Sequence, residues 1–88
     1  MAELSVDVVA ADRAVWSGTA RSVTAPAHDG SLGILVGHTP LLALLGAGAV
    51  VIRPASGPEL EISVTGGFLS VDSDQVTVVA DEATLVTA

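Results

Sequence analysis

The 88-residue sequence contains no cysteine and no lysine. Without cysteine the chain forms no disulfide bond and offers no thiolate ligand to a metal ion. Without lysine it has no attachment point for biotin or lipoate, and it lacks the lysine that a P-loop requires after its last glycine. The two absences therefore exclude disulfide scaffolds, lysine-linked cofactor carriers and P-loop nucleotide-binding proteins.

Aromatic residues and positive charges are also scarce. Trp16 and Phe68 are the only aromatic residues, and three arginines stand against ten acidic residues, which gives a formal net charge of -7. Because a nucleic-acid-binding surface needs cationic side chains and usually stacking aromatic rings, we expect no nucleic-acid partner. The same charge balance disfavours anionic lipid headgroups and favours a basic protein as a partner.

Long hydrophobic runs are missing as well. The longest stretch without a charged or polar residue covers residues 41–52 and contains Gly46 and Gly48, whereas a membrane-spanning helix needs about 20 apolar residues. The N-terminal residues lack the basic start and apolar segment of a signal peptide. We therefore expect a mature cytosolic beginning and no direct insertion into a membrane.

The sequence does contain a series of short alternating patterns. Apolar and polar residues alternate over 4–9, 60–64 and 76–81, and this period of two predicts strands with one buried face. With about ten such short strands, frequent turn residues and no amphipathic helix, the chain is predicted to be all-β. We expect residues 1–88 to form a single antiparallel β-sandwich or barrel domain.

Turn-forming residues predict where the early strands end. A short strand over residues 14–16 is expected to end at Ser17-Gly18. The next strand, over 19–25, is expected to stop at Pro26, because proline cannot donate to a strand ladder. These boundaries would separate two short strands.

Residues 27–45 combine turn chemistry with an uncharged apolar end. A polar loop is predicted over 27–33, and residues 41–45 are compatible with a strand or with one turn of helix. His28, Asp29 and His38 form the only cluster that resembles a metal or acid-base site.

The spacing of that cluster does not support chemistry. It does not match the i, i+4 histidine pair of a helical metal site, and no third ligand follows nearby. A triad of Ser31, His38 and an aspartate is equally unsupported, because no Gly-x-Ser-x-Gly motif is present. We therefore predict no catalytic residue, no metal and no cofactor, and a protein-binding β domain remains.

Four apolar residues fall on the side of their strands where water is expected: Val9, Phe68, Val79 and Val86. A twist or bulge that turns each of them inward is one explanation, and a surface for a partner is the other. Together they favour a partner surface on the outside of one sheet.

Several motifs follow one another along nearly the whole chain. They are LSVDVV at 4–9, Trp16-Ser17-Gly18, the pattern Gly-x-x-Gly-Ile-x-x-x-His-x-Pro-Leu over 30–41, Gly66-Gly67-Phe68-Leu69, and VTVVAD at 76–81. In this order they resemble the epsilon subunit of F-type ATP synthases. The resemblance implies the N-terminal β-sandwich of that family, with two five-stranded sheets, at the foot of the central stalk of the rotor.

The resemblance also implies two partners and one absence. By motif position, the gamma subunit would contact His38, Thr39, Leu41 and Leu42, and the membrane-embedded c-ring would contact Asp29, Gly30 and Ser31. Ser31 stands where many relatives carry an acidic residue, and Val36 stands where proline is common. Many relatives continue into a two-helix C-terminal domain that binds ATP in some members, and we expect this helical hairpin to be absent here, because the sequence ends at Ala88.

The function implied is that of a non-catalytic rotor subunit. Such a subunit would link gamma to the c-ring for proton-driven ATP synthesis, peripheral to the cytoplasmic side of a bacterial plasma membrane. A stand-alone β-sandwich adaptor that binds another basic protein is the alternative, and an enzyme is the third hypothesis.

Overall fold

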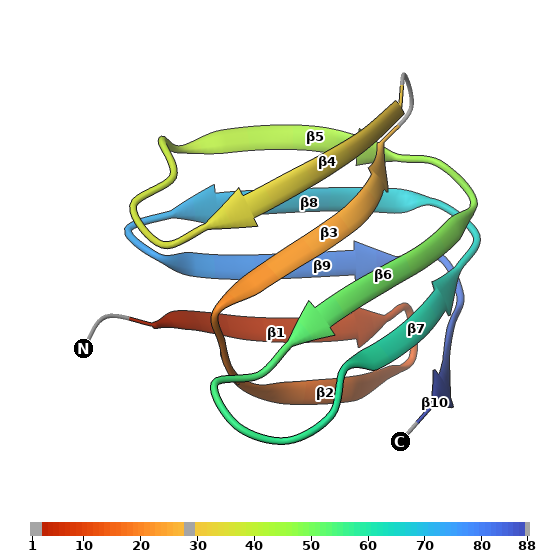
Figure 1. Ribbon diagram of the computed structural model, residues 1–88. Coiled ribbons are helices and arrows are strands. Elements are labelled where there is room, and N and C mark those ends of the chain that lie inside the picture. Colours follow the sequence, from red (N-terminus) through yellow and green to blue (C-terminus); the bar gives the residue numbers. More distant parts are fainter. Residues whose placement is uncertain (1–2, 28–29, 88) are drawn as a thin grey trace.

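The computed structural model describes residues 3–27 and 30–87 of the chain. These residues form ten strands and no helix (Figure 1). The strands are β1 (Leu4–Ala10), β2 (Arg13–Ala20), β3 (Ser22–Ala27), β4 (Gly30–Leu35), β5 (Leu41–Leu45), β6 (Gly48–Arg53), β7 (Leu60–Val64), β8 (Gly67–Asp72), β9 (Gln75–Ala80) and β10 (Ala83–Thr87).

The strands are arranged in two layers that face each other across the core, and strand pairing passes from one layer to the other at a single register match. Strands β10, β7, β6, β3 and β4 form one layer, here called the first sheet, and β5, β8, β9, β1 and β2 form the second sheet. The pair Ala27 and Leu45 is the only register match between β3 and β5 in the described residues. In Figure 1 the first sheet crosses in front of the second. The predicted all-β sandwich is confirmed, with one addition: β1 and β9 are parallel.

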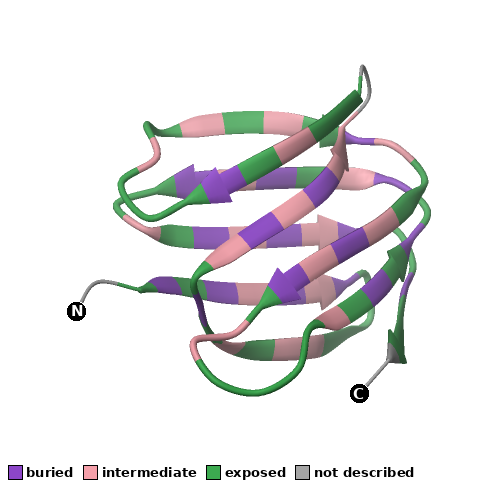
Figure 2. Cartoon of the chain, in the orientation of Figure 1, coloured by how far each residue is buried: buried purple, intermediate pink, exposed green. Residues whose placement is uncertain are grey.

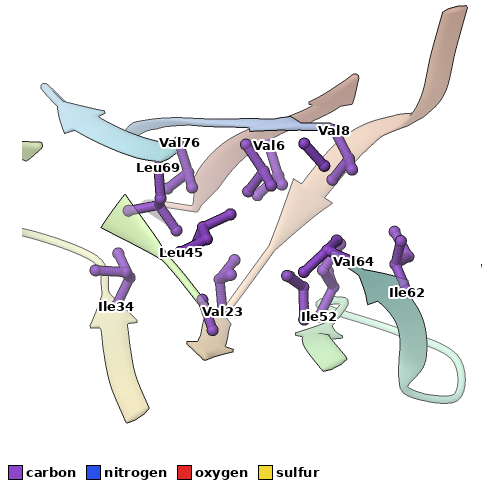
Figure 3. Close-up of a cluster of buried hydrophobic side chains, with 14 of the residues drawn as sticks. Val6, Val8, Val23, Ile34, Leu45, Ile52, Ile62, Val64, Leu69 and Val76 are labelled. Atoms are coloured by element: carbon purple, nitrogen blue, oxygen red, sulfur yellow. The ribbon is translucent and has the colours of Figure 1, made fainter. Parts of the chain in front are cut away.

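The core between the sheets is entirely aliphatic. Alternate residues point inward in most strands, as the pattern of β1 shows, where Leu4, Val6 and Val8 are buried and Ser5 is exposed (Figure 2). Figure 3 shows side chains from both sheets meeting in this core. No polar side chain is buried among the described residues. The alternation predicted for residues 4–9, 60–64 and 76–81 is thus confirmed.

The predicted end of a strand at Ser17-Gly18 is wrong. Strand β2 continues through both residues to Ala20, in register with β1. The Trp16 ring accounts for the glycine, because a Cβ atom at Gly18 would come within 2.8 Å of that ring. Gly18 therefore gives space to an aromatic side chain within a strand, and the chain bends only at Arg21.

The predicted stop at Pro26 is also wrong. Strand β3 runs to Ala27, and the Pro26 carbonyl accepts a hydrogen bond from the Gly46 amide at 2.7 Å. The nitrogen and carbonyl of one strand residue point to the same side, so the missing amide of Pro26 faces the side where pairing with β6 has already ended at Thr24. The proline therefore leaves no ladder partner unsatisfied.

Two further predictions concern residues 27–45. The predicted polar loop over 27–33 is wrong for its second half, because β4 begins at Gly30 and pairs with β3. Residues 41–45 are a strand, paired with β8 along their whole length. Pairing with β8 satisfies one side of the backbone of 41–45, so this leucine-rich segment is a strand and not a helix.

Candidate protein-binding surface

An apolar row crosses the outer face of the second sheet. Register pairs join Leu44 to Phe68, Phe68 to Val79, and Val79 to Val9, so these four residues, here called the apolar row, lie side by side on four strands. The side chain of Leu44 is 66% exposed and that of Phe68 40%, while Val9 and Val79 are half-buried. The predicted outward positions of Val9, Phe68 and Val79 are thus found on one surface. Val86 is exposed too, but it lies on β10 in the first sheet.

A shallow hollow lies at the β5 end of this row. It has a volume of about 250 Å³ and is lined by Leu42, Ala43, Leu44 and Phe68. Leu42 is 73% exposed, the highest value among the large hydrophobic residues described. Large apolar side chains gathered on an open sheet face are typical of a protein-binding surface.

A polar row runs beside the apolar row. Leu42 pairs with Ser70, Ser70 with Thr77, Thr77 with Asp7, and Asp7 with Ser17. We call Ser70, Thr77, Asp7 and Ser17 the polar row. The outer face of the second sheet is therefore apolar along one line and polar along the next.

Asp7 is held in place by both neighbouring strands. Ser17 Oγ donates to Asp7 Oδ1 at 2.8 Å from β2, and Gln75 Nε2 donates to Asp7 Oδ2 at 3.0 Å from β9. Ser17 thus belongs to the outer face, whereas its neighbour Trp16 packs against the core. No local sequence pattern points to this group, because the two contacts join residues 10 and 68 positions apart.

The segment that contains His38 follows the last residue of β4 and lies outside the strands. Gly37 has a φ of 85°, and its amide donates to Asp74 Oδ1 at 2.7 Å. The His38 amide donates to the Leu35 carbonyl at 3.1 Å, and its ring Nδ1 lies 2.6 Å from the Thr39 carbonyl oxygen. His38 is half-buried and Thr39 is exposed. The segment is therefore fixed to the turn that joins β8 and β9.

The four residues implied as gamma contacts do not all face the same way. Leu42 points outward, whereas Leu41 pairs with Val71 and packs against the core. Leu44, which the sequence analysis did not select, lies two residues beyond Leu42 and shares its outward face. The signal that could have identified Leu44 is its spacing of two residues from Leu42, because a strand places residues i and i+2 on one face. The sequence left a turn of helix equally open for this segment, so the spacing was not decisive.

Two of the three residues implied as c-ring contacts lie at the start of β4. Gly30 and Ser31 are exposed and pair with Ala27 and Pro26 of β3, and Asp29 lies outside the described residues together with His28. Strand β4 separates this hairpin from the His38 segment by about 17 Å, at about 3.4 Å per residue. The two implied contact groups are therefore at opposite ends of one strand.

Candidate metal ligands in the part of the chain that the structure describes are its acidic and histidine side chains. No group of three or more His, Asp or Glu side chains there is arranged so that it could hold a metal ion. A second hollow, of about 460 Å³, lies beside the β1–β2 and β9–β10 turns and is lined by polar residues that include Asp12, Arg13, Asp81 and Glu82. The Arg13 side chain already has a partner in this hollow, because its Nη2 donates a hydrogen bond to the Ala83 carbonyl at 2.8 Å.

Comparison with known proteins decides the family. A family model described as ATP synthase, Delta/Epsilon chain, beta-sandwich domain matches residues 3–86. The chain belongs to the ATP synthase delta/epsilon family. The resemblance carried by the sequence motifs is thereby confirmed.

Relatives in this family are ATP synthase epsilon chains from bacteria. The Micrococcus luteus protein is 48% identical over 97% of this chain and 93% of its own length. The Corynebacterium urealyticum protein is 49% identical over 94% of this chain and 68% of its own length. Epsilon chains are non-catalytic subunits of the ATP synthase complex, so the expectation of a subunit without its own catalytic activity is confirmed.

Solved structures show the same fold at lower identity. A chain of the Euglena gracilis mitochondrial ATP synthase, in an OSCP/F1/c-ring structure, matches with a TM-score of 0.90 at 21% identity, over 97% of this chain and 54% of that one. A chain of the Tetrahymena thermophila mitochondrial ATP synthase, in a central stalk/c-ring structure, matches with a TM-score of 0.78 at 18% identity, over 92% of this chain and 65% of that one.

Within the described residues of the delta/epsilon-type chain, no helix is long and apolar enough to cross a membrane.

Proposed function

We propose that this chain is a central-stalk subunit of a bacterial F-type ATP synthase that joins the gamma subunit to the c-ring. Its contribution is mechanical: a rigid β-sandwich fixes the geometry of the stalk and transmits torque, while catalysis takes place elsewhere in the complex. The complex would place the chain on the cytoplasmic side of the plasma membrane.

The observation that carries the proposal is the apolar row with Leu42 beside it. Leu42 and Leu44 are 73% and 66% exposed, and burying one such side chain contributes about 1.5 to 3 kcal/mol. A partner that covers this face gains several such contacts at once. We assign this face to gamma, with His38 and Thr39 at its edge and Leu41 supporting β5 from the core side.

The c-ring is assigned to the hairpin between β3 and β4. Gly30 and Ser31 are exposed at its described end, and Asp29 is proposed to add its charge there. The hairpin and the apolar row lie on different parts of the sandwich, so one chain can engage both partners at once. The two structural relatives come from assemblies described as F1/c-ring and central stalk/c-ring, which supports this arrangement.

Co-purification tests the proposal. The tagged chain is mixed at low salt with the gamma subunit and c-ring of the same organism, and we expect a stable complex that contains all three. A chain that retains neither partner contradicts the proposal. A chain that instead retains only an unrelated basic protein supports the adaptor function.

A further inference from the structure

The Asp7 carboxylate has an incomplete set of partners. An ionised carboxylate has about four acceptor positions on its two oxygens, and Ser17 and Gln75 each occupy one. Both donors are neutral. The ion pairs among the described residues join Arg13 to Asp12 and Arg53 to Glu59, and none includes Asp7.

The position of Asp7 makes this incompleteness significant. It lies on β1, with β9 on one side and β2 on the other, so it is in the interior of the sheet face and not at its rim. It is also two residues from Val9 of the apolar row. A partner that covers the apolar row would therefore remove water from Asp7 as well.

Covering a lone carboxylate is unfavourable unless a cation replaces the lost water. Burying one ion without a partner carries a large desolvation penalty, and a well-placed counter-ion with further hydrogen bonds offsets it. Arginine suits this role best, because its planar fork donates two parallel hydrogen bonds to a carboxylate. Charged residues are depleted in interface centres, with arginine as the exception.

We infer that Asp7, oriented by Ser17 and Gln75, is a receptor for a cationic side chain, in particular arginine, of the gamma subunit. The inference rests on the proposed function and adds to it the chemistry of the partner. It also gives the Trp16-Ser17-Gly18 motif a role on each side of β2: Trp16 packs inward over Gly18, and Ser17 orients the receptor.

The register of the second sheet gives the spacing of this contact. Leu42 and Asp7 lie in the same cross-strand line, on β5 and β1, with β8 and β9 between them. Three strand intervals of about 4.8 Å place them about 14 Å apart. The surface of gamma should therefore present a cationic side chain about 14 Å from the apolar group that fills the hollow at Leu42.

The test measures binding of purified gamma to three forms of the chain by titration calorimetry at two salt concentrations. Asp7→Asn removes the charge and keeps the shape. Glu61→Gln makes the same change in net charge on β7 of the first sheet, where Glu61 is exposed, and it serves as the matched control. We expect Asp7→Asn to raise the dissociation constant at least about tenfold and to flatten its salt dependence, and Glu61→Gln to change it less than about twofold.

A second experiment identifies the cation. Each Arg and Lys on the interacting face of gamma is replaced by Gln, and double-mutant cycles with Asp7→Asn are measured. One of these residues should lose its effect when Asp7 is already Asn. If Asp7→Asn proves too unstable to measure, Ser17→Ala retains the charge and should weaken binding by a few fold through loss of orientation.

The outcomes separate the two proposals. If the unaltered chain does not bind gamma, the proposed function fails and this inference fails with it. If the unaltered chain binds, but Asp7→Asn binds equally well with the same salt dependence, or no cation of gamma couples to Asp7, the inference alone is wrong and Asp7 serves only to join β1, β2 and β9.

Discussion

The amide nitrogen of Gly37 lies 2.7 Å from a carboxylate oxygen of Asp74, which is 37 residues further along the chain. Asp74 is in the turn between β8 and β9, where it has a φ of 62° and its neighbour Ser73 a φ of 51°. This hydrogen bond fixes the segment that carries His38 to the second sheet. The proposed edge of the gamma surface is therefore positioned by a turn distant in sequence.

Removing the Asp74 carboxylate should release that segment. Asp74→Gly keeps the positive φ that the turn requires but leaves the Gly37 amide without its acceptor, so exchange of that amide with deuterated solvent should accelerate about fivefold or more. Unfolding free energy should change by less than about 1 kcal/mol, because relief of left-handed strain offsets the lost bond. Ser73→Gly is the control, and it should leave Gly37 exchange unchanged. Equal exchange in both variants would show that the bond does not restrain the segment.

Introducing charge on the apolar surface should prevent gamma binding without unfolding the chain. Leu42→Asp places a carboxylate in the hollow, while its own 73% exposure limits the loss of stability to about 0.5 kcal/mol. We expect the dissociation constant for gamma to rise more than about tenfold. Leu85→Asp, on β10 of the first sheet and 44% exposed, is the matched control and should bind normally. Unfolding of Leu42→Asp would instead place Leu42 in the core.

Backbone packing at Gly67 should tolerate no side chain. A Cβ atom there would lie 2.0 Å from the Val79 carbonyl oxygen, at a φ of 129°, so Gly67→Ala requires the β8 and β9 backbones to separate. We expect a loss of at least about 3 kcal/mol in unfolding free energy, measured in urea. Gly57→Ala also has a positive φ, 98°, but meets nothing within 4 Å, and it should cost about 1 kcal/mol. Similar losses for both variants would contradict this account of β8 and β9.

The natural absence of cysteine allows a direct test of the c-ring assignment. Ser31→Cys creates a single thiol at the β3–β4 hairpin, and oxidative cross-linking in membranes should join it to a c subunit that carries a cysteine in its polar loop. Thr84→Cys, exposed on β10, should not cross-link. Cross-linking from Thr84 but not from Ser31 would move the c-ring contact to the other end of the sandwich.

The sequence predicted those features that local chemistry determines. Alternation over 60–64 identified β7 and its buried face, because burial of one side of a strand imposes a period of two. The outward positions of Val9, Phe68 and Val79 followed from the same rule. That they lie side by side depends on strand order and register, which a local sequence pattern does not determine.

The wrong predictions arise where contacts between residues distant in sequence determine the structure. Gly18 predicts the end of a strand, whereas the Trp16 ring occupies the space that the glycine leaves. Pro26 predicts a stop, whereas its missing amide faces the side where pairing with β6 has already ended. The Asp7 group was missed altogether, because it requires β9 to lie beside β1 in parallel. In each case the tertiary neighbour, and not the residue type, decides the outcome.

The central claim is that gamma covers the outer face of the second sheet, and methyl cross-saturation from gamma to this chain measures it most directly. The account predicts strong saturation of the methyl groups of Leu42, Leu44, Val9 and Val79, and none at Leu85 or Val86 on β10. Saturation confined to β10, or spread evenly over both sheets, would contradict it.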